Sequence, residues 1–292
     1  MRDILILNCH EIGCPLVLMY VFVELCDEFL RNGYNVKIIK NINEIHNNSI
    51  VFMGDTFRIE NPAELLNIQS PEAIYIGWYW DRINVSNLKY FIFTYENMLK
   101  PEGLISHVER FKVLKSKVNN HPLLLRANDS PEKIGKYNRN DKYMFCYMGC
   151  DYFPECKPTK YSGFYHGTKD HKKYLNYNAR KNIYLSSTFA LGFQSYENIK
   201  SEHVSQRIYE GLAYGCVVLT NSQPACIQTQ GICVYVTSKN DIEDKIKYYL
   251  QHPDEIKKKQ EKGYEFIKKM GTNQYSIDGY KSIIKTIYNI NI

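Results

Sequence analysis

The feature that most constrains the fold is a series of short apolar runs separated by segments of helical or turn character. Short strands that alternate with helices and polar loops favour an α/β fold with a parallel sheet. Helices are expected over residues 16–31 and 206–214, with three more helical stretches towards the C-terminus. The expected strands are residues 3–8, 35–40, 49–54, 73–78, 90–95, 142–148, 189–193, 216–220 and 233–237.

Residues 126–141 interrupt this pattern. They are polar, include Pro131 and Gly135, and lack apolar periodicity, which predicts an inter-domain linker. We therefore expect an N-terminal domain over residues 1–130 and a C-terminal domain over residues 131–292, with room for the terminal helix to cross back to the first domain. Two α/β domains of this kind form a cleft, where ligands usually bind.

The composition is that of a globular protein, with 44% apolar and 23% charged residues. The formal net charge of +6 is compatible with an anionic substrate, a nucleic acid or an acidic membrane surface. Part of the excess lies in the stretch from Lys257 to Lys269. Because glutamates are interleaved there, a solvated helix face is favoured over a peripheral contact surface.

The first strand is expected to follow Met1-Arg2-Asp3 directly, with no secretory leader, and the chain has nine cysteines. Reduced thiols and a cytoplasmic location are the expectation. The most apolar stretch, residues 16–25, is about half of the ~20 residues that cross a bilayer, so we expect no transmembrane segment.

A metal site is not expected. The candidate ligands have no Cys-x2-Cys spacing and fit no standard zinc site. They are Cys146, Cys150, Cys156, His166 and His171.

The most informative run is residues 197–224. Glu202 and Glu210 form an E-x7-E pair, Arg207 lies between them, and Ser205 is a candidate N-cap for the following helix. A helix N-terminus and a guanidinium together suit a diphosphate, and a carboxylate suits ribose hydroxyls. An exposed ion pair between residues three apart on one helix face fits the same spacing equally well.

The surrounding sequence resembles the C-terminal domain of spore-maturation-type glycosyltransferases of the GT-B class. The resemblance runs in order from Val204 to Ile267 and includes an Arg, a Glu before an apolar helix, a Gly and a hydrophobic strand, followed by further family positions. These are Arg207, Glu210, Gly215, Val217 to Thr220, Val234 to Val236, Asp241, His252-Pro253 and Gly263.

A looser similarity is to the α1,3-fucosyltransferases. Tyr196-Glu197-Asn198 stands where that family has an aromatic residue before Glu-Asn, and residues 203–207 stand for its Tyr-Val-Thr-Glu-Lys segment. Gln206 and Arg207 replace the family's Glu and Lys, so the similarity does not identify the donor.

The resemblance implies two Rossmann-like domains facing across a cleft and an enzyme that transfers a sugar from a nucleotide-diphosphate sugar. The donor is a co-substrate, so no cofactor is expected. The sequence lacks the Asp-x-Asp motif that holds a divalent ion in the other main glycosyltransferase fold, in agreement with metal-independent transfer. The implied donor-binding residues are Glu197, Asn198, Glu202, Ser205, Arg207, Glu210, Thr220 and Asn221.

Fold analogy places the catalytic base in loops that follow the N-terminal strands. His10, Glu11 and Asp55 are the candidates, with His10 preferred because its usual pKa is near neutral. A capping or turn role is also open for each of them.

Two other functions stay open. The chain could be a non-catalytic nucleotide- or nucleic-acid-binding protein that uses its basic surface and many tyrosines. It could also be a glycosyltransferase that acts on modified DNA bases. The acceptor (glycan, protein or nucleic acid) is not identified by the sequence.

Overall fold

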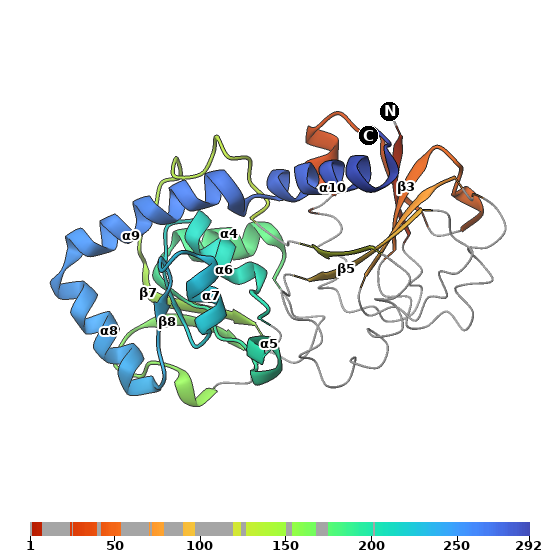
Figure 1. Ribbon diagram of the computed structural model, residues 1–292. Coiled ribbons are helices and arrows are strands. Elements are labelled where there is room, and N and C mark those ends of the chain that lie inside the picture. The colour runs from red at the N-terminus through yellow and green to blue at the C-terminus, as the bar shows by residue number, and fades with distance from the viewer. Residues whose placement is uncertain are drawn as a thin grey trace. The chain divides into compact units, whose positions relative to one another are not determined.

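The computed structural model describes residues 2–7, 24, 26–39, 42–53, 70, 72–78, 90–96, 119–123, 127–149, 154–167, 175–200 and 202–292. The chain divides into two compact units (Figure 1). The first consists of Met1–Leu124 with Ser276–Ile292, and the second of Leu125–Tyr275. Each unit contains one sheet of parallel strands.

The first unit has a six-stranded sheet in the order β2-β1-β3-β4-β5-β6. Every neighbouring pair is parallel. The strands are β1 (Asp3–Leu7), β2 (Val36–Ile39), β3 (Ser49–Met53), β4 (Ile74–Trp78), β5 (Tyr90–Glu96) and β6 (Asn119–Leu123).

The last helix of the chain, α10 (Asn273–Tyr288), packs on this first sheet. The ring of Tyr280 meets the ring of Phe52 on β3 at 5.7 Å between centroids, and Figure 1 shows the helix beside that strand. Residues 26–31 are helical and bring Phe29 against Phe52 as well. A short 3-10 helix, η1 (Ile42–Glu44), lies between β2 and β3 in the chain.

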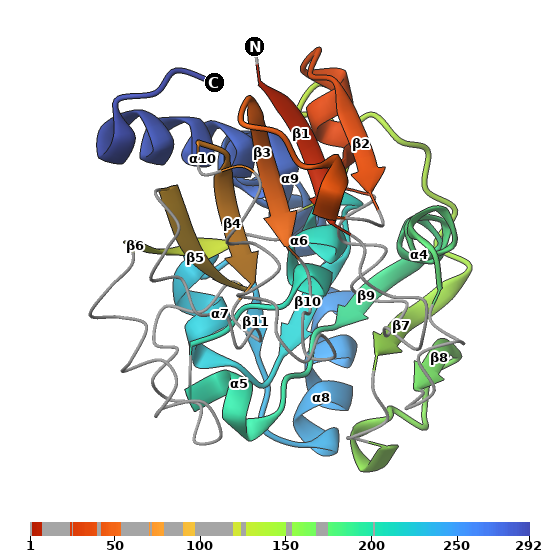
Figure 2. The same cartoon turned by 90° about the vertical axis from the view of Figure 1, so that its right-hand side faces the viewer.

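The second unit has a five-stranded parallel sheet in the order β11-β10-β9-β7-β8, which can be followed in Figure 2. Its strands are β7 (Tyr143–Gly149), β8 (Gly163–Gly167), β9 (Ser187–Leu191), β10 (Val217–Thr220) and β11 (Val234–Tyr235). Its helices are η4 (Pro154–Cys156), α4 (Tyr177–Leu185), α5 (Tyr196–Lys200), α6 (Gln206–Ala213), α7 (Gln223–Gln228), α8 (Lys239–Gln251), α9 (Pro253–Phe266) and η6 (Ile267–Gly271).

Alternate residues of each strand in the second unit belong to two separate cores. On β7, Cys146 and Met148 join the core beneath α4 and α6, whereas Phe145 and Tyr147 join the core beneath α8. Ala190 on β9 and Val218 on β10 also belong to the core beneath α4 and α6. Because helices cover both faces of a parallel sheet, both faces must be apolar, which explains why these strands read as continuous apolar runs.

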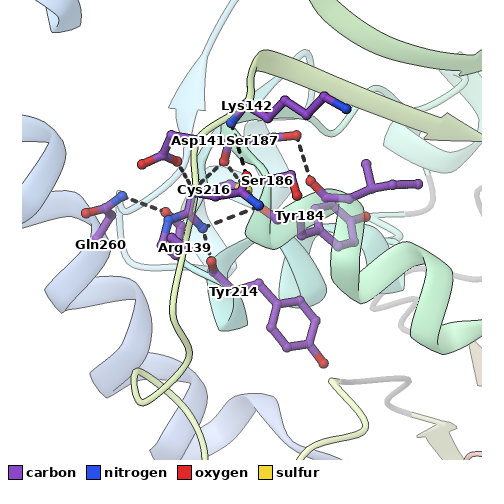
Figure 3. A network of polar contacts seen from close by, with 12 residues as sticks. Arg139, Asp141, Lys142, Tyr184, Ser186, Ser187, Tyr214, Cys216 and Gln260 are labelled. Carbon is purple, nitrogen blue, oxygen red and sulfur yellow. Dashed lines mark hydrogen bonds and ion pairs between the residues drawn. The ribbon is translucent and has the colours of Figure 1, made fainter.

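The segment expected to be a linker is instead packed into the second unit. Ala127 and Ile134 are fully buried, and Arg139 binds the backbone of three elements (Figure 3). Its guanidinium donates to the carbonyls of Tyr214, Ser187 and, at 3.3 Å, Tyr184.

Tyr184 lies in the last turn of α4 and Tyr214 caps the end of α6. Helix C-termini leave carbonyls without intrahelical partners and favour cations. Arg139 therefore holds the segment in place by satisfying both helix ends at once.

The predicted α/β class and the strands named from the sequence are confirmed, with ends that shift by at most two residues. Two strands were missed. β6 reads NNHPL and β8 reads GFYHG, and these sequences lack the β-branched runs that signal a strand. Among the described residues, no helix has the length and apolarity to cross a membrane.

Replacing Arg139 with Ala should lower the free energy of unfolding by about 2–4 kcal/mol, because hydrogen bonds to a charged group are lost and the Tyr184 and Ser187 carbonyls keep only the weak thiol donor of Cys216. Denaturant unfolding measures the change. Lys136→Ala, in an exposed position of the same segment, is the control and should change stability by less than about 0.5 kcal/mol. Equal stability of the two variants would contradict the anchoring role.

Candidate functional site

The strand order of the second unit fixes where a ligand is expected. From β7 the chain moves to β8 on one side and to β9, β10 and β11 on the other. In open α/β sheets, ligands bind at the carboxyl ends of the strands where the order reverses, the topological switch point. Here that point lies between the ends of β7 and β9, at Gly149 and the segment 192–194.

Arg207 reaches this switch point from the first turn of α6. Its Nη1 lies 3.5 Å from the carbonyl oxygen of Phe193, just after β9. A Cβ atom on Gly149 would clash with its guanidinium, so the cation rests directly on the backbone at the end of β7. The guanidinium also lies 5.8 Å from the ring of Tyr147. Arg207 therefore contacts both strands that flank the switch point.

The N-terminus of α6 is at the same place. Ser205 occupies the N-cap position with φ −65° and ψ 149°, but its side chain makes no capping hydrogen bond within the described residues. The first amide groups of a helix have no intrahelical partner and favour anions. A guanidinium in the first turn of a helix, beside its N-terminal amides, is an arrangement that binds phosphate oxygens.

Glu210 is buried and pairs with Arg180 of α4, across the interface between α4 and α6. Arg180 Nη2 lies 2.7 Å from Oε1, and Nε lies 3.1 Å from Oε2. The alternative reading of an exposed Arg207–Glu210 pair is therefore wrong, because Glu210 is only 2% exposed. A carboxylate offers about four lone-pair directions, so this pairing leaves Glu210 some capacity to accept another donor.

A second buried carboxylate supports α4 and α6. Asp129 Oδ2 accepts from Lys181 at 3.0 Å and from Tyr214 at 2.9 Å. Burial raises the pKa of Asp129, but hydrogen bonds that include these two outweigh it and hold the pKa below its usual value. Burial raises the pKa of Tyr214 far above its usual range. The carboxylate is thus charged and the phenol neutral, which keeps the pair in a single protonation state.

Glu202 has a left-handed backbone conformation with φ +54°. Its amide donates to Ile199 and that of His203 donates to Asn198, which is the Schellman pattern that ends α5. Glycine is the usual residue there because an L side chain costs about 1–2 kcal/mol in this conformation. Whether the Glu202 carboxylate has a functional role is a hypothesis that relief of this conformation can test.

The remaining predicted donor-binding residues have internal roles or are only partly described. Thr220 Oγ1 donates to Gly192, and Asn221 bonds the backbone of Gln194. The amide of Asn198 donates to Ser195. Glu197 lies in α5, but its side chain is outside the described residues.

The predicted catalytic residues His10, Glu11 and Asp55 lie outside the described residues, so their roles stay predictions. Within the described ranges, no three His, Cys, Asp or Glu side chains are grouped to hold a metal ion. Cys150 and His171 of the considered zinc ligands are outside those ranges.

Sequence reasoning missed three residues of the site. Gly149 ends a strand without a motif, and Arg180 lies 30 positions from its partner. Gln194 follows β9 and carried no signal of its own. The glycine at a strand end was the one readable clue, since such a glycine permits close approach of another group.

The second unit matches a known family. Residues 145–279 match the family model described as glycosyl transferase-like. The match includes Gly149, Arg207 and Glu210. No curated protein sequence matches the chain.

The fold matches solved structures over nearly the whole chain. T4 phage β-glucosyltransferase is 12% identical, with a TM-score of 0.54 and coverage of 98% of this chain and 99% of that one. An α-glucosyltransferase solved with UDP and a 13-mer DNA containing an HMU base has the same identity, score and coverage. A glycosyltransferase from Rickettsia africae is 13% identical over the same shares, with a TM-score of 0.50.

At such identities the likeness defines the fold, which is that of GT-B glycosyltransferases. Together with the family match over residues 145–279, this fold supports a glycosyltransferase of the GT-B class. The predicted class, fold and enzyme type are confirmed. The looser similarity to α1,3-fucosyltransferases stays a prediction.

Replacing Glu202 with Gly should raise the free energy of unfolding by up to about 1 kcal/mol, because the left-handed conformation is relieved. The same change should reduce transferase activity if the carboxylate serves the reaction. Gln230→Gly is the matched control, since Gln230 has φ +55°; it should gain stability and keep activity. Denaturant unfolding and turnover measure the two effects, and a Glu202→Gly enzyme with full activity would contradict the functional role.

Replacing Arg180 with Met should destabilise the protein by about 3–5 kcal/mol, because it leaves a buried carboxylate without its cation. Adding Glu210→Met should recover much of that loss. A double-mutant cycle from denaturant unfolding measures the coupling, expected above about 2 kcal/mol. Additive effects of the two changes would show that the pair does not hold α4 to α6.

Proposed function

We propose that this chain transfers a sugar from a nucleoside-diphosphate sugar to an acceptor, without a metal ion. The observation that carries the proposal is the position of Arg207 at the topological switch point, on Gly149 and beside the N-terminus of α6. The family match supports the reaction type. Two fold relatives were solved in complex with UDP, so UDP is the first nucleotide to test.

In this proposal, Arg207 and the α6 amides hold the diphosphate. Negative charge grows on the diphosphate as the bond to the sugar breaks, so fixed positive groups there stabilise the transition state more than the ground state. Glu210 orients the ribose through its remaining lone pairs, and Arg180 keeps its carboxylate in place. Glu202, Asn198 and Glu197 contribute polar groups near the sugar.

The N-terminal unit is proposed to bind the acceptor. His10 and Glu11 follow β1, and Asp55 follows β3. In the sheet order β2-β1-β3, these two strands flank the switch point of the first unit. A base at either strand end would remove the proton of the acceptor hydroxyl.

DNA is a candidate for the acceptor. One fold relative was solved with DNA that contains a modified base, and the chain carries a net charge of +6. Against a broad basic surface, Lys259 is occupied by the carbonyls of Gly231 and Ile232, and exposed glutamates alternate with the other α9 lysines. Transfer of labelled sugar to hydroxymethylated DNA, compared with glycan acceptors, distinguishes these acceptors.

Release of UDP from a UDP-sugar, with and without acceptor, separates an enzyme from a non-catalytic binding protein. If Arg207 and the N-terminus of α6 supply the positive charge that stabilises the diphosphate, activity should persist when a metal chelator is added. Loss of activity that added Mn²⁺ or Mg²⁺ restores would contradict the metal-independent part of the proposal.

Replacing Arg207 with Ala should lower kcat/KM by about 10²–10³-fold, as expected for one preorganised charge-stabilising donor. Gly149→Ala should also lower it, because the added methyl group displaces the guanidinium while the charge is retained. Steady-state kinetics measure both variants. Lys247→Ala, on the exposed side of α8, is the control. Activity of Arg207→Ala within a few-fold of wild type would remove Arg207 from the diphosphate site.

A further inference from the structure

The side-chain carboxamide of Gln194 is buried without a hydrogen-bond partner in the described part of the chain. Gln194 follows β9 at the switch point, is 2% exposed, and neither its Oε1 nor its Nε2 has a hydrogen-bond partner among the described residues. Burial of an amide without hydrogen bonds is unfavourable. Such groups in native proteins call for an explanation, and an absent ligand is one.

The loop that carries Gln194 does not depend on its side chain. The side chain of Asn221 accepts from the backbone N–H of Gln194 at 2.9 Å and donates to the backbone carbonyl of Gln194 at 3.0 Å. Thr220 fixes the neighbouring Gly192 carbonyl at 2.7 Å. Since the backbone is held by β10 and the residue after it, the carboxamide is not needed to shape the loop.

Ser205 presents the same situation on the other side of Arg207. Its Oγ is buried and lacks a hydrogen-bond partner among the described residues, although a serine at an N-cap normally accepts from the first turn. Arg207 is two residues further along and approaches the carbonyl of Phe193, the residue before Gln194. Two neutral polar groups without hydrogen-bond partners among the described residues therefore belong to the two segments that the Arg207–Phe193 contact joins.

We propose that Gln194 and Ser205 bind hydroxyl groups of the transferred sugar and so select the donor. This inference rests on the proposed function, in which Arg207 binds the diphosphate. A carboxamide and a hydroxyl each donate and accept, as sugar hydroxyls do, whereas a phosphate only accepts. A site built to hydrogen-bond hydroxyl groups rejects analogues that lack them, because its own polar groups are then left unpaired.

The test compares UDP with UDP-glucose, UDP-galactose and UDP-N-acetylglucosamine by calorimetric titration. Gln194→Met keeps the length of the side chain and removes both polar atoms. It should leave UDP affinity within about twofold and weaken the tightest UDP-sugar by about tenfold or more, about 1.4 kcal/mol. Ser205→Ala should show the same selective loss, and Gln251→Met, in an exposed position of α8, should show none.

Thermal unfolding without ligand gives an independent readout. Because no structural hydrogen bond is removed, Gln194→Met should melt at the same temperature as wild type or higher. A clear drop in its melting temperature would show that the amide has a structural role and would overturn the inference.

The binding outcomes separate this inference from the function on which it rests. Equal weakening of UDP and UDP-sugar, or no weakening of either, overturns the role of Gln194 alone. Wild-type binding of UDP but of no UDP-sugar overturns the sugar site and leaves the diphosphate site standing. If wild type binds no nucleoside diphosphate at all, the proposed function fails and this inference with it.

Discussion

The second unit depends on a parallel sheet that is covered by helices on both faces. Such a sheet needs apolar side chains on both faces, and β7, β9 and β10 supply them alternately to the two cores. The polar groups proposed to bind the ligand therefore lie beyond the strand ends. In the order β11-β10-β9-β7-β8, the strand order reverses between β7 and β9, because the chain continues from β7 to β8 on one side and to β9 on the other. Gly149, Arg207 and the N-terminus of α6 occupy that place.

Buried polar groups then hold the helices around this point. Arg180 and Glu210 connect α4 to α6, and Asp129 binds Lys181 of α4 and Tyr214 at the end of α6. Arg139 donates to the carbonyls of Tyr184 and Tyr214 at the two helix ends. Arg180, Glu210 and Asp129 are paired with opposite charges, whereas neither polar atom of the Gln194 side chain nor the Ser205 hydroxyl has a hydrogen-bond partner among the described residues. The difference between satisfied and unsatisfied buried groups separates the parts that build the site from the parts proposed to bind the ligand.

Periodicity and motif order were enough to predict the α/β class, most strands and the helix that carries Arg207. They could not reveal β8, because GFYHG has no strand signature and gains its place by pairing with β7. The roles of Arg180 and Arg139 could not be predicted either, because their hydrogen-bond partners lie far away in the sequence. For the same reason the spacing of Arg207 and Glu210 suggested a mutual pair, whereas packing against α4 gave Glu210 a different cation. The left-handed backbone conformation of Glu202 could not be predicted from composition either.

The account's central claim is that the switch point of the second unit binds a nucleoside diphosphate. A crystal structure of the chain with bound UDP tests it most directly. We expect the terminal phosphate within about 3–3.5 Å of the Arg207 guanidinium and of the first amides of α6, the range of a charge-assisted hydrogen bond. UDP bound elsewhere, with Arg207 and α6 untouched, would contradict the claim.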